Sequence, residues 1–490
     1  MIDKIVRLGK EAAIYGLSSI VGRFLNFLLV PFYTNLLVPS EYGIIANLYS
    51  YIAFVAIVFG YGMDAAYMRY VASLEIGDKK QNFSTPLVSL FVTSLVLAFG
   101  ISLSAELLAQ WIGMGADGGS LVLYAAWILF FDTVVLIPYA YLRMENKAGT
   151  FAAVRIANIV LTVLLNILFL VGFDMKADGV VLANLIASVL TFGIHLRFIL
   201  PNFTLSLPGN LYKELLRFGL PYIPAGLASV AMQVIDRPIL KALTDDATVG
   251  IYQANYRMGV FMMLFVGMFD YAWRPFFLRQ AREPDARQLF ARVFTFFSVA
   301  AMSLFVVLTL FIDDLIRIRV GSVYFIHPDY WAGALIIPVV LLAYALNGAY
   351  VNFLIGVYLE KKTSILPSVF GIGAVVNVAA NIVLIPKYGI MGAAYATLLS
   401  YIALAVGIYI PSQRLYRIEY EWQKILGLLA VVTLVVSVSR MFPLAPATME
   451  GILWKCGFLT AFVVLIFFGR IVTLGEVREA LGTVKSLTGS

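Results

Sequence analysis

Long runs of apolar residues alternate with short polar segments from one end of this sequence to the other. Each run holds about 20 residues, the length that an α-helix needs to cross a hydrocarbon core of about 30 Å. The runs are continuously apolar and lack the two-residue alternation of barrel strands, so they predict helices. The predicted spans are 12–36, 42–63, 84–105, 120–141, 151–173, 178–199, 218–242, 250–273, 289–312, 330–352, 365–385, 390–410, 425–442 and 451–471.

The composition agrees with this pattern. The chain is 61% hydrophobic and only 13% charged, and its mean hydropathy is +0.91. These values lie outside the range of soluble globular proteins. We therefore expect an all-α integral membrane protein with about fourteen transmembrane helices. No loop is long enough to form a soluble domain, so any function must reside among the helices.

The distribution of basic residues predicts the orientation of the spans. With a cytoplasmic N-terminus, 24 of the 35 Lys and Arg residues fall in inner segments and 7 in outer segments, and the other four lie within spans. This asymmetry follows the positive-inside rule and predicts that both termini are cytoplasmic. The basic residues are dispersed among short loops, so the net charge of +7 does not indicate nucleic-acid binding.

Two parts of the chain resemble one another in the same order. In the first pair of similar stretches Gly43 aligns with Gly250, and in the second pair Asn166 aligns with Asn381. Six spans in each half return the chain to the same side, so the halves should be parallel repeats related by an axis normal to the membrane. The predicted parts are an N-lobe (1–210), a C-lobe (211–424), two further helices (425–471) and a cytoplasmic amphipathic tail (472–490).

Four arginines lie inside predicted spans, namely Arg23, Arg155, Arg237 and Arg257. A charged side chain at membrane depth costs roughly 2.5 to 3.5 kcal/mol or more, so it usually faces a protein interior or a wet cavity. Since few acidic residues accompany them, the arginines indicate an anionic cargo. A purely structural role, with the guanidinium bound to backbone carbonyls, stays open for each, and Arg155 is close enough to the cytoplasmic end to extend to the interface.

Polar residues near these arginines are expected to share their site. Asp132 lies midway along its span, either as a counter-ion to Arg155 or Arg23 or as a proton-titrating group, and Asp236 directly precedes Arg237. Both acids are predicted to serve as counter-ions or in coupling. The predicted substrate-binding residues are Arg23, Asn26, Arg155, Arg237, Gln253, Asn255, Tyr256 and Arg257.

The sequence lacks the motifs of common enzymes. It contains no G-x-x-x-x-G-K-[ST] phosphate loop, no H-E-x-x-H or G-x-S-x-G motif and no Cys/His cluster. We therefore expect a transporter with no catalytic residues, no cofactor and no metal site, and one that does not hydrolyse ATP itself.

Three segments together resemble a known family: YGLSSIVGRFLNFLLVPFYTNLLVPSEYGI, IDRPILKALTDDATVGIYQANYRMG and IPKYGIMGAAYATLLSYI. They are similar to polysaccharide transport (O-antigen type) flippases of the multidrug/oligosaccharidyl-lipid/polysaccharide (MOP) exporter superfamily. The resemblance implies a bacterial inner-membrane protein with two six-helix lobes around a central cavity. It also implies translocation of a polyprenyl-diphosphate-linked oligosaccharide to the outer leaflet by alternating access.

The resemblance further implies roles for particular residues. In related flippases of the peptidoglycan precursor, arginines in the first and eighth helices are associated with the substrate diphosphate, which here points to Arg23 and Arg257. The glycan would serve O-antigen (lipopolysaccharide), capsule or exopolysaccharide biosynthesis, with membrane lipids and the polymerase and ligase machinery as partners and no nucleic acid.

Two alternatives stay open. A cation-coupled drug or metabolite exporter would share the fold and need essential acidic residues, but the first helix carries no acid. A membrane-embedded glycosyltransferase or polymerase would need a sizeable extracytoplasmic loop, which this sequence lacks.

Overall fold

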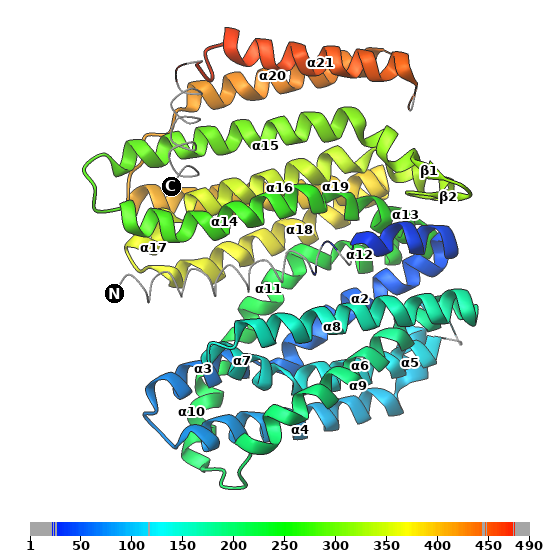
Figure 1. Cartoon of the computed structure of the whole chain (residues 1–490), viewed down its shortest axis with the longest axis vertical. Helices are drawn as coiled ribbons and strands as arrows, with labels where there is room; N and C mark the ends of the chain where they lie inside the picture. The colour runs from blue at the N-terminus through cyan, green and yellow to red at the C-terminus, as the bar shows by residue number, and fades with distance from the viewer. Residues whose placement is uncertain are drawn as a thin grey trace. The chain divides into compact units, whose positions relative to one another are not determined.

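The computed structural model describes residues 27–115, 118–442 and 448–473, and residues 22, 24, 446 and 475 besides. Within these residues almost every segment is helical (Figure 1). The exception is a small antiparallel hairpin of β1 (Arg319–Val320) and β2 (Val323–Tyr324). The prediction of an all-α membrane protein is thus confirmed.

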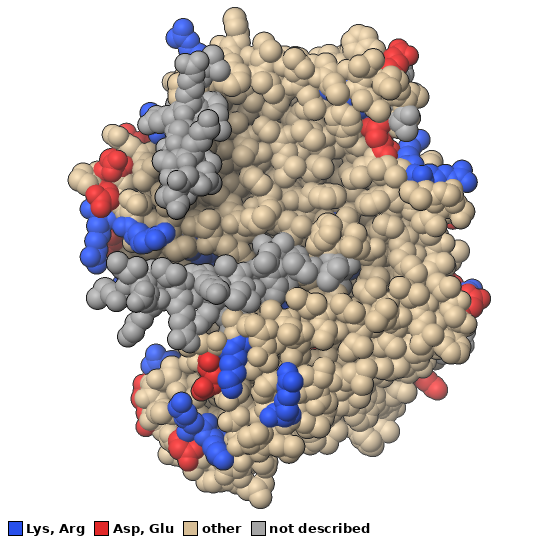
Figure 2. Space-filling view, viewed as in Figure 1, with Lys and Arg blue, Asp and Glu red and all other residues tan. Residues whose placement is uncertain are grey.

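The predicted number of spans is also confirmed. Twelve helical stretches of the described chain are long and apolar enough to cross a membrane. The helix Phe27–Leu36 forms the described part of the predicted span 12–36, and α13 with α14 covers the predicted span 250–273. On the face drawn in Figure 2, charged side chains gather toward the ends of the helices and leave most of the surface between them uncharged.

Contacts divide the chain into two compact units, of which the first comprises residues 1–260 and 366–400. In this unit α2 packs against α13, α6 and α8 pack against α9, and α11 packs against α18. Its helices are α2 (Pro39–Gly60), α3 (Met63–Ser73), α4 (Lys79–Leu103), α5 (Ala105–Trp111), α6 (Gly119–Val134), α7 (Leu136–Met144), α8 (Ala148–Ile167), α9 (Lys176–Asn202), α10 (Gly209–Gly219), α11 (Tyr222–Val234), α12 (Asp236–Leu243), α13 (Asp246–Tyr256), α18 (Leu366–Tyr388) and the start of α19 (Ile390–Leu415), with the short turns η2 (Leu168–Gly172) and η3 (Arg257–Gly259).

The second unit comprises residues 261–365 and 401–490. In this unit α15 packs against α16, α20 and α21, and α20 packs against α21. It contains α14 (Val260–Gln280), α15 (Ala286–Arg317), the β-hairpin, η4 (Pro328–Gly333), α16 (Ile336–Phe353), α17 (Ile355–Leu359), η5 (Thr363–Ile365), the rest of α19, α20 (Trp422–Met441) and α21 (Met449–Phe468).

These units group the helices differently from the predicted lobes. The predicted lobe boundaries at residues 210 and 424 rest on the sequence repeat, and they stay a prediction. The predicted amphipathic tail (472–490) lies almost wholly outside the described residues.

Local sequence explains where the helices break. Pro138 and Pro224 lie in the first turns of α7 and α11, where the missing N–H has no helical partner to lose. Between α2 and α3, Gly62 adopts a left-handed conformation with φ of +71°. The predicted spans 42–63 and 120–141 are therefore each built from two shorter helices, and the span 218–242 covers the end of α10 together with α11 and α12.

Candidate binding site

A polar cavity lies inside the first unit. Its volume is about 300 Å³, and its walls come from the helix Phe27–Leu36, α2, α8, α9, α13 and η3. A cavity of this size has room for several waters or a polar ligand group. The lining residues are Leu29, Tyr33, Tyr42, Ile45, Ala46, Tyr49, Asn158, Ile159, Thr162, Asn166, Val180, Asn184, Gln253 and Arg257.

Arg257 is the one cation among these lining residues, and no acidic residue is among them. It follows the last turn of α13 and begins η3, and its side chain is exposed. Within the described part of the chain it forms no ion pair. A guanidinium held in this way presents several N–H donors and a full positive charge to the cavity.

The neutral wall of the cavity is ordered by its own hydrogen bonds. The Tyr33 hydroxyl donates to Oδ1 of Asn166 over 3.1 Å. The amide nitrogen of Asn184 donates to the Tyr49 hydroxyl over 2.8 Å. These bonds fix the orientation of hydroxyl and amide groups that also face the cavity, so a ligand meets donors and acceptors at set positions.

The sequence predicted only two of the residues that form this cavity, Arg257 and Gln253. Three of the missed residues, Asn158, Thr162 and Asn166, lie four positions apart on α8 and so share one helix face. This spacing of polar residues within an apolar span was a signal that could have been found. No such signal existed for the tyrosines, because they count as apolar in the hydropathy pattern.

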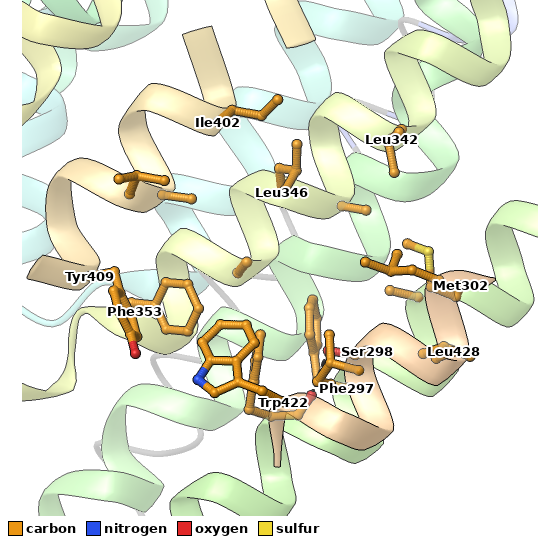
Figure 3. Close-up of a pocket in the computed structure, with 18 residues that line it drawn as sticks. Phe297, Ser298, Met302, Leu342, Leu346, Phe353, Ile402, Tyr409, Trp422 and Leu428 are labelled. Carbon is orange, nitrogen blue, oxygen red and sulfur yellow. Dashed lines mark hydrogen bonds between the residues drawn. The ribbon is translucent and has the colours of Figure 1, made fainter. Parts of the chain in front are cut away.

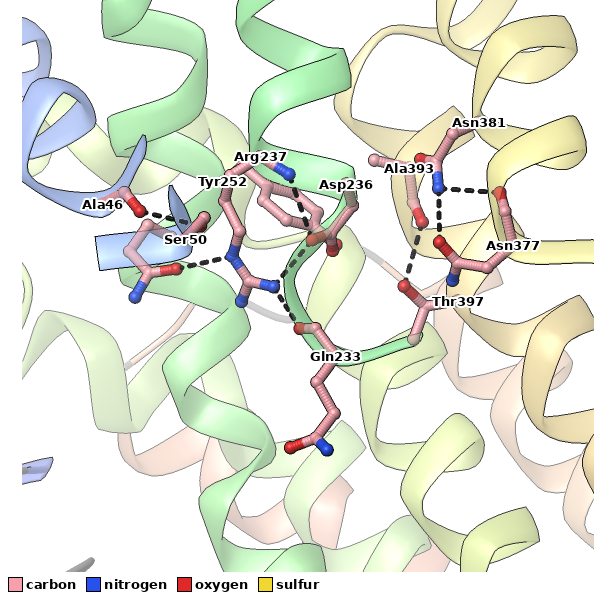
Figure 4. A network of polar contacts seen from close by, with 11 residues as sticks. Ala46, Ser50, Gln233, Asp236, Arg237, Tyr252, Asn377, Asn381, Ala393 and Thr397 are labelled. Carbon is pink, nitrogen blue, oxygen red and sulfur yellow. Dashed lines mark hydrogen bonds and ion pairs between the residues drawn. The ribbon is translucent and has the colours of Figure 1, made fainter. Parts of the chain in front are cut away.

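Arg237 belongs to a buried polar network instead of lining the cavity (Figure 4). Its Nη1 donates to Oδ1 of the adjacent Asp236 over 2.6 Å and to the carbonyl oxygen of Gln233 over 2.5 Å. The Tyr252 hydroxyl donates to the other carboxylate oxygen of Asp236 over 2.5 Å. Asp236, predicted as a counter-ion or coupling residue, thus pairs with Arg237, predicted as a substrate-binding residue, inside the unit.

A bond from this network reaches the wall of the cavity. The Nε of Arg237 donates to Oε1 of Gln253 over 3.1 Å, and its guanidinium lies 4.3 Å from the centroid of the Tyr256 ring. Asn255 is fully buried and donates its amide to the Ile251 carbonyl oxygen. Of the four predicted residues around Arg257, only Gln253 therefore reaches the cavity.

The other predicted residues lie apart from the cavity or outside the described residues. The guanidinium of Arg155 lies 5.6 Å from the ring centroids of both Tyr139 and Phe151, and its side chain is exposed. Asp132 is exposed as well, and within the described chain neither residue forms an ion pair with a side chain. Arg23 and Asn26 fall outside the described residues. The predicted binding and coupling roles of all these residues stay predictions.

The second unit contains a cavity of the opposite character. It measures about 390 Å³ and lies among α15, α16, α19 and α20 (Figure 3). Apart from the Ser298 hydroxyl, the Tyr409 hydroxyl and the Trp422 indole nitrogen, its lining side chains are aliphatic or aromatic, and none is charged. Such walls offer no partner for a phosphate or a polyol, so we place the candidate site at the Arg257 cavity.

Comparison with solved structures identifies the class of fold. The lipid II flippase MurJ in an inward closed conformation superposes with a TM-score of 0.70 at 17% identity, covering 94% of this chain and 97% of that one. An inward-facing multidrug resistance MATE family transporter of the MOP superfamily gives a TM-score of 0.60 at 15% identity, covering 82% and 97%. The Vibrio cholerae MATE transporter VcmN in its bent form gives 0.55 at 15% identity, covering 84% and 97%. The chain therefore has the fold of MOP superfamily transporters.

The family follows from the sequence. Residues 8–281 match the family described as polysaccharide biosynthesis protein, and the chain belongs to that family. A search of curated proteins gives no match.

Proposed function

We propose that this protein is a flippase that moves a polyprenyl-diphosphate-linked oligosaccharide from the cytoplasmic to the outer leaflet of a bacterial inner membrane. The observation that carries the proposal is the polar cavity that contains Arg257. A single cation without a carboxylate partner, set among hydroxyl and amide groups, suits an anionic headgroup that also carries sugar hydroxyls. The family match and the shared fold with a lipid II flippase support the same class of cargo.

The energetics agree with this role for Arg257. At an effective dielectric constant near 20, a guanidinium 4 Å from a phosphate charge contributes on the order of 4 kcal/mol. This attraction offsets part of the hydration that the phosphate loses on entering the protein. The polyprenyl tail stays in lipid throughout. Export of an anion from an inside-negative cell gains about 2.3 kcal/mol per charge per 100 mV, so ATP hydrolysis is not required.

Export of a cationic drug is a poorer match to the same cavity. A cation would need a carboxylate near its site, and among the described residues that line the cavity there is none. The proposed glycan serves a surface polysaccharide, either O-antigen, capsule or exopolysaccharide.

Reconstitution tests the proposal directly. Purified protein in liposomes is given polyprenyl-diphosphate-linked N-acetylglucosamine with a nitrobenzoxadiazole dye on the sugar, and flipping is followed by dithionite bleaching. We expect Arg257→Ala to slow flipping at least about tenfold, which corresponds to 1.4 kcal/mol. Arg257→Lys should retain part of the rate, because it keeps the charge but loses the planar fork.

Arg197→Ala is the matched control, since Arg197 is an exposed arginine of α9 that does not line the cavity. It should flip the labelled lipid at the wild-type rate. If the wild-type protein does not accelerate flipping of this lipid, the proposed function is wrong. If Arg257→Ala flips the lipid at the same rate as Arg197→Ala, the assigned role of Arg257 is wrong.

A further inference from the structure

The second unit contains a polar cavity at one end of its helices. The cavity lies where the end of α15, the start of α16, the end of α20 and the start of α21 come together. Its volume is about 330 Å³, within the range of about 300 to 1,000 Å³ found for pockets that bind small ligands. It shares no lining residue with the Arg257 cavity of the first unit. It is therefore a separate place at which a polar group could bind.

Three charged side chains line this cavity, and they differ in their partners. Nζ of Lys455 lies 2.5 Å from Oδ2 of Asp314, so the charge of Lys455 is neutralised within the wall. Asp313 and Arg440 are both exposed, and within the described part of the chain neither forms an ion pair. Their charged atoms therefore lie more than 4.0 Å apart. The cavity thus presents one carboxylate and one guanidinium that can each take up a ligand group of the opposite charge.

The side chains around this cavity place it at the membrane boundary. Leu335 and Phe442 line the cavity and are exposed on the protein surface. The Phe442 ring stacks on the ring of Trp454 with a centroid distance of 5.4 Å, and Trp454 is exposed as well. Exposed aromatic side chains at the ends of spanning helices mark the level of the lipid headgroups. The charge distribution along the sequence predicts that this end of the helices belongs to the outer leaflet.

We propose that this cavity binds the headgroup of a phosphatidylethanolamine molecule from the surrounding bilayer. The Arg440 guanidinium donates two hydrogen bonds to the phosphate oxygens, a geometry that suits its planar fork. The Asp313 carboxylate accepts hydrogen bonds from the primary ammonium group. The acyl chains then lie in the hydrocarbon beside the exposed apolar side chains. Because Asp313 belongs to α15 and Arg440 to α20, one bound lipid bridges the two helices.

The two unpaired charges also distinguish this lipid from other phospholipids. Phosphatidylglycerol offers the phosphate but no cation, so it leaves the Asp313 carboxylate without a partner. Phosphatidylcholine carries a fully methylated ammonium group, which has no N–H to donate to that carboxylate. Phosphatidylethanolamine satisfies both residues and leaves the net charge of the site unchanged.

Native mass spectrometry of the purified full-length protein tests the site with these three lipids, each carrying identical acyl chains. We expect phosphatidylethanolamine to bind at least about tenfold more tightly than either of the others, which corresponds to 1.4 kcal/mol. Asp313→Asn should abolish this preference, because it removes the charge that faces the ammonium group. Arg440→Gln should weaken binding of all three lipids at least about tenfold, because they share the phosphate.

Arg319→Gln and Asp329→Asn are the matched controls, because both residues are exposed at the same end of the second unit and neither lines the cavity. Both should bind the lipids as the wild type does. All variants are measured on protein that elutes as a single species, so a fraction that fails to fold does not contribute.

Three results would overturn the proposal. The first is equal affinity of the wild type for the three lipids, and the second is a preference that survives Asp313→Asn or a phosphate affinity that survives Arg440→Gln. The third is displacement of the bound lipid by an equal concentration of soluble glycerophosphoethanolamine, which would identify a free solute as the ligand. Because the assay uses no lipid-linked sugar, its outcome is independent of the proposed cargo.

Discussion

The buried pair of Asp236 and Arg237 permits a test that separates a structural arginine from a cargo-binding one. The side chains of Arg237 and Asp236 are 7% and 3% exposed, and Nη1 lies 2.6 Å from Oδ1. At an effective dielectric constant near 20, this separation gives a gross attraction of about 6 kcal/mol, most of which offsets the cost of burying both ions. Removing one partner leaves the other charge buried without compensation.

We therefore expect Arg237→Ala to reduce the stability of the detergent-solubilised protein by about 3 to 5 kcal/mol. Arg274→Ala is a matched control, because it removes another Arg–Asp pair with a nitrogen-to-oxygen distance of 2.7 Å in which Arg274 is 44% exposed and Asp270 is 27% exposed. That pair should contribute at most about 1 kcal/mol, since water screens it. Thermal unfolding followed by intrinsic tryptophan fluorescence compares the two.

The double variant Asp236→Asn/Arg237→Gln completes the design. Its loss of stability should be smaller than the sum of the two single losses, because it removes both charges together. The reasoning fails if Arg237→Ala unfolds at the same temperature as Arg274→Ala. If Arg237→Ala kept the stability of the Arg274→Ala control but lost flipping activity, Arg237 would act on the cargo, as the sequence predicted, and not on the fold.

Two further changes test the packing around the sites. Asn166→Leu removes the acceptor of the Tyr33 hydroxyl. We expect the flipping rate of the labelled lipid to fall at least about threefold, because a neutral hydrogen bond contributes about 0.5 to 1.5 kcal/mol. Asn202→Leu on α9 is the comparison. Lys455→Ala removes the bond of 2.5 Å between Nζ of Lys455 and Oδ2 of Asp314, which joins α21 to α15; the two side chains are 5% and 17% exposed. We expect the free energy of unfolding to fall by about 3 kcal/mol and proteolysis at the start of α21 to become faster. Unchanged proteolysis would contradict this role.

The sequence predicted the helices well, because a membrane span is determined by one variable, the length of its apolar run. Of the residues that it singled out, Arg257 and Gln253 line the candidate cavity, and the charge of Arg257 is conspicuous inside an apolar run. The sequence could not show which helices pack together, and the cavity forms where they do. For example, Asn166 lies on α8 and its partner Tyr33 lies on the helix Phe27–Leu36, 133 residues earlier.

The pairing of Asp236 with Arg237 was hidden for a different reason. Consecutive helical residues point about 100° apart, so their positions in the sequence do not predict that they pair. The long arginine side chain overcomes that angle by folding back, and its Nη1 also bonds the Gln233 carbonyl oxygen one turn earlier. Patterns of Cβ directions do not capture contacts made at the far end of a flexible side chain.

Arg237 and Arg257 have different surroundings. Within the described chain, only one of the two guanidinium groups is neutralised by a carboxylate. Arg237 is neutralised by its neighbour, and through Gln253 it fixes a residue of the cavity wall. Arg257, one turn after Gln253, is left with no carboxylate among the described residues that line the cavity. Arg237 is buried and paired, whereas Arg257 is exposed and forms no ion pair within the described residues. A guanidinium left without a carboxylate can accept a ligand anion, and under the proposed function that anion is the headgroup phosphate.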